Sequence, residues 1–415
     1  MATLFTNISA LAGTYDAGEG LGGPLRSDAL ATLPIMQNAF LLVESGRIVS
    51  FGPMDLVPVG IPDHDIIDAD GRIILPAWCD SHTHLVFGAS RENEFIDKIK
   101  GLSYAEIAAK GGGILNSAAR LNGMSEDELF RLAVERLHEA ARLGTGAIEI
   151  KSGYGLTVEG ELKMLRVIKK LKQKSALSIK ATFLGAHAFP PEYRDNHEGY
   201  LRLIEEDMLP VIAREQLADY IDVFCEHGFF SPQETERICL AGARYGLRPK
   251  IHANQLNLSG GVQTGVKMNA LSVDHLETMD EDAIRSLAGS NTIGTLLPTA
   301  AFFLRMPFQP ARQLIDAGCA IAIATDFNPG SSPSFNMNLV MAMSCIQMKM
   351  LPEEAINAAT INGAYAMGLE AEHGCIRVGN HANLILTHRI PSLAYLPYAF
   401  GTNLVETVMI KGEFI

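Results

Sequence analysis

The central part of the chain, about residues 75–375, alternates short apolar runs with amphipathic helical segments, and this alternation limits the fold more than any other feature. Eight apolar runs can be counted, the first of which leads into His82. The others lie at about 146–150, 178–184, 221–225, 249–252, 270–275, 292–297 and 320–326. Many end in a polar or ionisable residue, as the strands of a parallel barrel do when a site lies at their carboxyl ends. We therefore expect an α/β fold built on a (β/α)8 TIM-type barrel.

A doubly wound open sheet is the rival architecture for such alternation. Its usual mark is a G-x-G-x-x-G fingerprint that opens a helix after the first strand, and the sequence has none there. The barrel is therefore the better prediction. One helix is marked especially well, because Ser125-Glu126-Asp127-Glu128 has the pattern of a capping box and the segment that follows runs towards Leu143.

Both ends of the chain are rich in strand-forming residues instead. Residues 39–52 predict a hairpin that turns at Ser45-Gly46. Further short strands are expected at 4–11, 65–69, 72–75, 383–387 and 405–412, whereas the Gly-rich stretch 13–33 is expected to be a loop. We expect residues 1–74 and 376–415 to meet in one small β-sandwich domain that brackets a barrel domain over residues 75–375.

Charge and hydropathy exclude several classes of partner. The formal net charge is −13, which argues against nucleic acid or an anionic membrane as the main partner. No run of about twenty apolar residues occurs, and the N-terminus lacks a basic region followed by an apolar one. We expect a cytoplasmic protein that acts on a small molecule.

The segment Asp80-Ser81-His82-Thr83-His84 is the strongest candidate for chemistry. His82 and His84 lie two positions apart at the end of a strand, so their side chains point to the same side. Two adjacent imidazoles suit a cation such as zinc or ferrous iron, although two strand-end histidines without a metal would give the same pattern. His252 and Asp326, each at the end of its own apolar run, complete a set of three nitrogens and one oxygen.

Such a set leaves a position for water, whose pKa a divalent metal lowers from about 16 towards 7. Asp326 could bind the metal and also accept a proton from that water, or it could simply cap the turn that follows it. His187 and His275 also lie at apparent strand ends. Each could polarise a carbonyl or move a proton, as histidines with a pKa near 7 do, or each could be structural.

Several weaker candidates accompany these residues. His227 is placed like His187, and Tyr154 closes another strand, where it could meet a substrate. Arg91 could bind a carboxylate in a bidentate manner, or it could be a solvated residue paired with Glu92 or Glu94. The Gly-rich segment Lys110–Ile114 could cradle an anion, and Lys151 could bridge two metals if carbamylated or could be an ordinary paired lysine. The remaining histidines are expected at the surface: 64, 138, 197, 373, 381 and 388.

The segment 80–84, after a strand-rich N-terminal piece, resembles the amidohydrolase superfamily, whose barrels hold a hydrolytic metal on such a pair. Five longer stretches are more specifically similar to the imidazolonepropionase family: 82–95, 104–114, 149–156, 183–193 and 324–333. The resemblance covers the whole chain and is weakest in residues 1–60. It implies one divalent metal ion per chain, zinc or iron, and metal-assisted hydrolysis of the ring C–N bond of 4-imidazolone-5-propanoate to N-formimidoyl-L-glutamate in histidine degradation. It also makes a homodimer a reasonable expectation.

Residues are carried over position by position. The metal ligands are then His82, His84, His252 and Asp326. The substrate-binding positions are Arg91, Tyr154, His187 and Ser331, and the positions that hold the product are Asn328 and Gly330. The resemblance implies that His275 and His187 stabilise the developing oxyanion or move protons, with Asp326 as proton acceptor.

One substrate position departs from the family pattern. Gln255 stands where related enzymes have Glu, three residues after the metal-binding His252. An amide can hydrogen-bond the ring, but it cannot carry a proton at pH 7. If the Glu of related enzymes is essential for proton transfer, Asp326 or His275 must do that work in this chain.

Three other functions are compatible with parts of the pattern. A ring deaminase would use the same mononuclear site, but it has little use for a carboxylate anchor such as Arg91. A binuclear cyclic-amide hydrolase would need a second ion and a modified Lys151. A metal-dependent binding protein without turnover is favoured only by Gln255.

Overall fold

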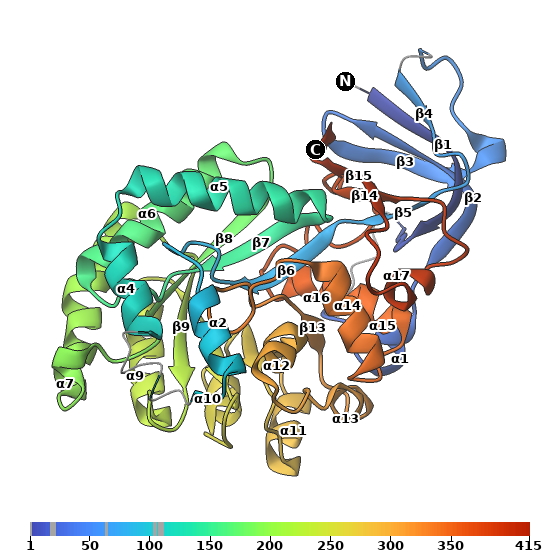
Figure 1. Cartoon of the computed structure of the whole chain (residues 1–415). Coiled ribbons are helices and arrows are strands. Elements are labelled where there is room, and N and C mark those ends of the chain that lie inside the picture. Colours follow the sequence, from blue (N-terminus) through green and yellow to red (C-terminus); the bar gives the residue numbers. More distant parts are fainter. Residues whose placement is uncertain (1, 17–21, 63–64, 103–105, 107–111) are drawn as a thin grey trace.

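The structure, a computed structural model, describes residues 2–16, 22–62, 65–102, 106 and 112–415, in which the strands form two eight-stranded sheets (Figure 1). One sheet is parallel, and each of its strands pairs with the next one along the chain. Its strands are β6 (Trp78–Thr83), β7 (Thr145–Lys151), β8 (Ser178–Ala186), β9 (Tyr220–Cys225), β10 (Arg248–Ala253), β11 (Ser272–His275), β12 (Ile293–Leu296) and β13 (Ile321–Ile323). The predicted α/β fold with a (β/α)8 barrel is confirmed.

The barrel closes at the carboxyl ends of its first and last strands. Just beyond β13, the backbone N–H of Asp326 donates to the carbonyl of His82 at 3.0 Å. The N–H of His84 donates in turn to the carbonyl of Phe327 at 2.8 Å. Closure therefore brings Asp326 directly beside the two histidines of β6.

Helices surround the barrel on its outer side (Figure 1). They are α2 (Glu92–Ile99), α4 (Ile114–Asn122), α5 (Glu126–Arg142), α6 (Val158–Lys174), α7 (His197–Arg202), α8 (Leu209–Glu215), α9 (Pro232–Ala243), α10 (Gly261–Lys267), α11 (Glu281–Ala288), α12 (Pro298–Leu304), α13 (Ala311–Asp316), α14 (Met337–Ile346), α15 (Pro352–Ala359), α16 (Ile361–Tyr365) and α17 (Tyr395–Tyr398). A π-helical segment, Leu203–Met208, joins α7 to α8. The predicted capping box is present, since Ser125 and Glu128 hydrogen-bond each other's backbone N–H at the start of α5. None of the described helices is long and apolar enough to cross a bilayer.

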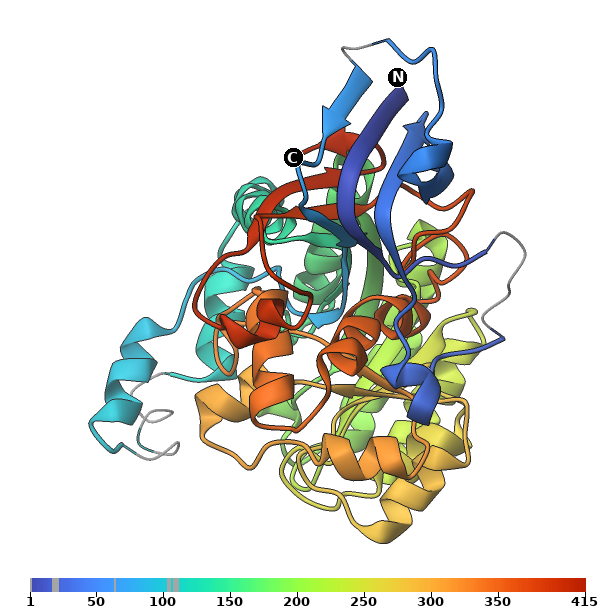
Figure 2. The same cartoon turned by 90° about the vertical axis from the view of Figure 1, so that its right-hand side faces the viewer.

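The second sheet joins the two ends of the chain, which lie at the same end of the molecule (Figures 1 and 2). Its strands are β1 (Ala2–Ala12), β2 (Ile35–Glu44), β3 (Arg47–Pro53), β4 (Ile66–Asp68), β5 (Ile73–Pro76), β14 (Leu384–Thr387), β15 (Val405–Ile410) and β16 (Glu413–Phe414). β5 pairs with β1 on one side and with β14 on the other, so it links the N-terminal and C-terminal strands. Phe5, Leu41 and Met409 pack in one apolar core of this sheet. The division at residues 74 and 376 stays a proposal.

Three local expectations need correction. The apolar run that leads into His82 forms two strands instead of one: β5, which ends at Pro76, belongs to the second sheet, and β6, which begins at Trp78, belongs to the barrel. The stretch 13–33, predicted as a loop, contains a short helix, α1 (Ser27–Ala31), while residues 17–21 lie outside the described part. The last barrel strand is also shorter than predicted, so Asp326 lies in the loop beyond it.

Candidate active site

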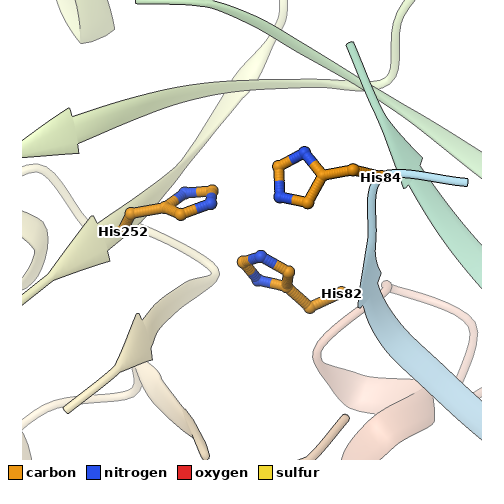
Figure 3. Close-up of side chains that lie close together, drawn as sticks. All are labelled: His82, His84 and His252. Atoms are coloured by element: carbon orange, nitrogen blue, oxygen red, sulfur yellow. The ribbon is translucent and has the colours of Figure 1, made fainter. Parts of the chain in front are cut away.

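Three histidine rings meet at the carboxyl end of the barrel. His82 belongs to β6 and His84 follows it, while His252 comes from β10. Figure 3 shows the rings pointing toward one another. The ring centroid of His82 is 4.5 Å from that of His252 and 5.4 Å from that of His84, and the last two are 5.5 Å apart. All three side chains are buried, so the closed barrel encloses a compact cluster of nitrogen donors.

Asp326 and His275 extend this cluster on one side. Asp326 Oδ1 lies 3.5 Å from Nε2 of His82 and 3.5 Å from Nε2 of His84. His275 also lies close, because His275, His82 and Asp326 bring one donor atom each within 4.8 Å of one another. Burial raises the pKa of Asp326 to about 6, although His275 and His252 oppose the shift. A carboxyl group with such a pKa is well suited to accept a proton near neutrality.

The donor atoms of the cluster fit a divalent metal ion. Nε2 of His82 and Nε2 of His252 are buried and have no hydrogen-bond partner among the described residues. Burial lowers the pKa of His82 and of His84 well below the usual range, so both rings are neutral and offer lone pairs. Three imidazoles and a carboxylate suit zinc or iron. The cluster is therefore a possible His/Asp metal site.

Lys151 is not free to bridge two metals. Its Nζ lies 2.6 Å from Glu149 Oε1 and 2.8 Å from Asp222 Oδ2, and its side chain is completely buried. Burial alone would lower the pKa of Lys151, but Asp222, Glu149 and Asp274 outweigh it and raise the pKa. Carbamylation needs the neutral amine, so this geometry favours a paired Lys151 over the alternative of a modified one. The interpretation as a paired lysine holds.

A cavity of about 480 Å³ adjoins the cluster. It is lined by Arg91, Glu94, Lys98, Ile114, Tyr154, His187, Phe224, Phe229, Gln255, Leu256, Leu304, Asn328, Gly330 and Ser331. All of the positions predicted to bind substrate are among these residues. The ring of His84 lies 5.7 Å from that of Tyr154 and 5.4 Å from that of His187, measured between centroids, so the wall of the cavity continues into the histidine cluster.

Arg91 is held in the cavity wall rather than in solvent. It precedes α2, and its Nε donates to Ser117 Oγ at 2.8 Å. Its Nη2 is buried without a hydrogen-bond partner in the described part of the chain. Arg91 Cζ lies 5.8 Å from the ring centroid of Tyr154. The alternative of a solvated Arg91 paired with Glu92 or Glu94 is wrong, and the unpaired edge of the guanidinium can receive a carboxylate.

Tyr154 and His187 also line the cavity, and both are uncharged, in contrast to Arg91. Burial raises the pKa of Tyr154, so its hydroxyl stays a donor. Burial lowers the pKa of His187 to about 3, although its hydrogen bond to Gly153 opposes the shift. His187 Nδ1 lies 2.9 Å from the Gly153 carbonyl and must carry the proton of the neutral ring, which leaves Nε2 as an acceptor. The expected pKa near 7 is wrong for His187, and its geometry does not favour donation to an oxyanion.

Asn328 builds the loop that follows Asp326. Its Oδ1 accepts hydrogen bonds from the backbone N–H groups of Gly330 and Ser331, each at 2.8 Å. Its amide nitrogen donates to the Asp326 carbonyl and to Ser331 Oγ, each at 2.7 Å. Every polar atom of the Asn328 side chain is thus used within the loop, so its geometry fits a positioning part better than the predicted ligand contact.

Some expectations concerned residues that the structure places elsewhere. His227 is exposed, so the structure does not bring it into the cluster. His373, expected at the surface, is buried, and its Nε2 lies 2.8 Å from Ser178 Oγ. In the Gly-rich segment Lys110–Ile114, residues 110 and 111 lie outside the described part.

Among the buried carboxylates that the sequence analysis did not single out, three lie beside candidate site residues. Glu277 Oε1 lies 3.3 Å from His275 Nδ1. Glu161 accepts from the backbone of the loop that carries Tyr154, and Glu226 accepts from the N–H of Leu256, next to Gln255. Glu277 and Glu226 each have a weak sequence signal, since each stands within two residues of a candidate histidine, His275 or His227.

Comparison with known proteins identifies the family. The family model described as Amidohydrolase family matches residues 187–415. An imidazolonepropionase of Flavobacterium johnsoniae is 59% identical over 386 residues, which cover 93% of this chain and 94% of that protein. An imidazolonepropionase of Flavobacterium psychrophilum is 53% identical over 415 residues and all of both chains. The solved E. coli guanine deaminase shares the fold, with a TM-score of 0.73 at 13% identity over 100% of this chain and 99% of that one. The chain belongs to the amidohydrolase family and, within it, to the imidazolonepropionases.

Proposed function

We propose that this protein hydrolyses the ring C–N bond of 4-imidazolone-5-propanoate to N-formimidoyl-L-glutamate, a step of histidine degradation. The observation that carries the proposal is the continuity between the histidine cluster and Arg91. The Tyr154 ring lies 5.7 Å from the His84 ring and 5.8 Å from the Arg91 guanidinium carbon. One small molecule with a reactive ring and a carboxylate tail can therefore span both ends of the cavity.

The histidine cluster would hold the metal. We propose His82, His84, His252 and Asp326 as its ligands, with one zinc or iron ion per chain. A divalent ion bound there supplies a Lewis acid and lowers the pKa of water towards neutrality. Asp326 is buried beside the cluster, and its carboxylate is placed to take the proton that the attacking water loses.

The other side chains would orient the substrate and respond to charge. Arg91 would bind the propanoate with its unpaired edge, and Ser117 keeps that edge turned to the cavity. Tyr154 would donate to the substrate, whereas His187 would accept a ring N–H through Nε2. His275 is the better candidate for protonating or stabilising the developing oxyanion, because burial alone would lower its pKa but Glu277 and Asp326 raise it.

Gln255 lines the cavity and would hydrogen-bond the ring without exchanging a proton. Ser331 and the backbone of Gly330 would contact the product, held in place by Asn328. We also propose a cytoplasmic location, on the sequence pattern, and a homodimer, on the family resemblance. Neither nucleic acid nor a membrane is proposed as a partner of this acidic chain.

Turnover of 4-imidazolone-5-propanoate by metal-loaded protein tests the proposal, with N-formimidoyl-L-glutamate and bound metal both quantified. We expect product and about one metal ion per chain. His252→Ala should lose both, whereas His227→Ala, which removes an exposed histidine from the loop after a neighbouring strand, should keep both. A filled metal site without product would overturn the activity and leave a deaminase or a binding protein.

A further inference from the structure

Apart from Asp80 of β6, which hydrogen-bonds Thr325, five fully buried Asp, Glu and Lys residues lie on strands around the histidine cluster. They are Glu149 and Lys151 of β7, Asp222 of β9, Lys250 of β10 and Asp274 of β11. Burying a charge is costly unless it is paired, so an arrangement of this size needs a reason beyond packing. The distances within it point towards the candidate metal ligands.

Lys151 is the branch point of the arrangement. Its Nζ lies 2.8 Å from Asp222 Oδ2 and 3.5 Å from Asp274 Oδ2, in addition to its contact with Glu149. An ammonium group has three N–H donors, and here three carboxylates surround it. Lys250 instead contacts Glu149 and donates to the carbonyls of Ser81 and Ala366. Of the two lysines, Lys151 is therefore the one that contacts both Asp222 and Asp274.

Each aspartate faces a histidine of the cluster with the same oxygen that faces Lys151. Asp274 Oδ2 lies 2.7 Å from His82 Nδ1, and Asp222 Oδ2 lies 3.0 Å from His252 Nδ1. Asp274 accepts the Nδ1 proton of His82 in a hydrogen bond, whereas Asp222 faces His252 Nδ1 at close range without an aligned hydrogen bond. The neutral ring then has its free lone pair on Nε2, the atom that faces the centre of the cluster.

We propose that Lys151 is a positioning residue for the metal site, which holds Asp222 and Asp274 so that His252 and His82 both present Nε2 to the ion. This inference rests on the metal site proposed above, but not on the identity of the substrate. It assigns to Lys151 a part in metal binding without making it a ligand.

The electrostatics of the arrangement agree with this assignment. Burial alone would raise the pKa of both aspartates, but His252 and Lys151 at Asp222, and the two lysines at Asp274, hold each pKa below its usual range. Three carboxylates against two ammonium groups leave one net negative charge next to the cluster, which favours a cation there.

Lys151→Met tests the inference, because it keeps a long unbranched side chain, one atom shorter than that of lysine, and removes the charge. Lys170→Met is the matched control, since Lys170 is a lysine of α6 that pairs only at the surface, 2.6 Å from Asp127. Two properties of the zinc-loaded proteins would be measured without substrate: the rate of zinc release to a chelator, and the Nδ1 proton signals of 15N-labelled histidine. In the parent we expect slowly exchanging Nδ1 protons on His82 and His252.

We expect Lys151→Met to release zinc about 10- to 100-fold faster, the usual effect of losing a partner of a metal ligand, and to lose or shift both Nδ1 signals. Lys170→Met should match the parent. If Lys151→Met matches the parent in release rate and in both signals, the inference is overturned while the proposed activity stands. If the parent binds no zinc, the proposed metal site and this inference fall together.

Asp222→Asn is a second variant in case Lys151→Met does not fold. Asp222 Oδ1 accepts from the backbone N–H groups of Val223 and His252, at 2.7 and 3.2 Å. The amide oxygen of Asn must stay at that position, so its NH2 group would replace Oδ2 and face both Lys151 and His252 Nδ1 as a donor. We expect faster zinc release and loss of the His252 signal, with the His82 signal kept. Retention of the His252 Nδ1 proton at the parental release rate would overturn the inference.

Discussion

His275 Nδ1 lies 3.3 Å from Glu277 Oε1 across a bend in which His275 and Leu276 have φ angles of 90° and 66°. Positive φ angles are unfavourable for residues other than glycine, and two in succession are a considerable local strain. The bend is fixed by backbone hydrogen bonds to β10 and the loop after it, because the N–H of Leu276 donates to the Ala253 carbonyl. It turns Glu277 back towards His275, so the strain serves to pair the two side chains.

Glu277→Gln is expected to lower kcat about 10- to 100-fold, within the range that a positioned proton-transfer group contributes. The amide keeps the volume of Glu277 but loses the charge that supports a proton on His275. The Michaelis constant should stay within about twofold, because neither side chain lies among the cavity residues around Arg91. Steady-state kinetics of the metal-loaded variant measures both constants.

The double variant Glu277→Gln/His275→Asn separates this explanation from general damage. If Glu277 acts through His275, the double variant should be no slower than His275→Asn alone, since coupled residues are not additive. Additive losses would show that Glu277 acts independently of His275.

Gly330→Ala should impair substrate binding without removing any charge. A Cβ at Gly330 would lie 2.5 Å from Arg91 Nη1, so the guanidinium must move. We expect a rise in KM similar to that of Arg91→Met, about 10- to 100-fold for the loss of a charge-assisted contact, with the metal content unchanged. If KM rises for Arg91→Met but not for Gly330→Ala, Arg91 can still bind the substrate after the added methyl group displaces its guanidinium.

Much of the fold and of the site could be predicted from the sequence because the signals were local. The capping box at Ser125 is set by neighbours in sequence, and the common direction of His82 and His84 follows from strand geometry. The sequence allowed a paired Lys151 but could not identify Asp222 and Asp274 as its partners, since they lie on other strands. Glu277 escaped for a different reason: the positive φ angles at positions 275 and 276 end the alternation on which strand arguments depend.

Glu161→Gln should destabilise the protein by about 2 kcal/mol, the cost of leaving a buried donor unsatisfied. Glu161 Oε2 accepts from the N–H of Gly153 at 2.9 Å, and Oε1 accepts from those of Gly155 and Leu156 at 2.7 and 3.0 Å. These residues flank Tyr154, so KM should rise as well. Urea unfolding with Glu159→Gln as control, an exposed residue in the same turn of α6, measures the difference. Equal stability of the two variants would contradict the prediction.

His373 should make the folded protein sensitive to acid. Burial, and to a lesser degree His381, lower the pKa of His373 from 6.5 to about 4. The unfolded chain therefore binds a proton at this position before the folded chain does. His373 therefore does not affect the unfolding free energy above about pH 6.5. As the pH drops from about 6.5 to about 4, its proton uptake lowers the unfolding free energy progressively, by up to about 3 kcal/mol.

His373→Gln tests this prediction, because glutamine can keep a hydrogen bond to Ser178 but cannot take up the proton. The gap in unfolding free energy between parent and variant should accordingly change by up to that amount between pH 7 and pH 4 in urea titrations. The exposed His138→Gln serves as control, and a gap that stays constant with pH would mean that His373 titrates normally in the folded state.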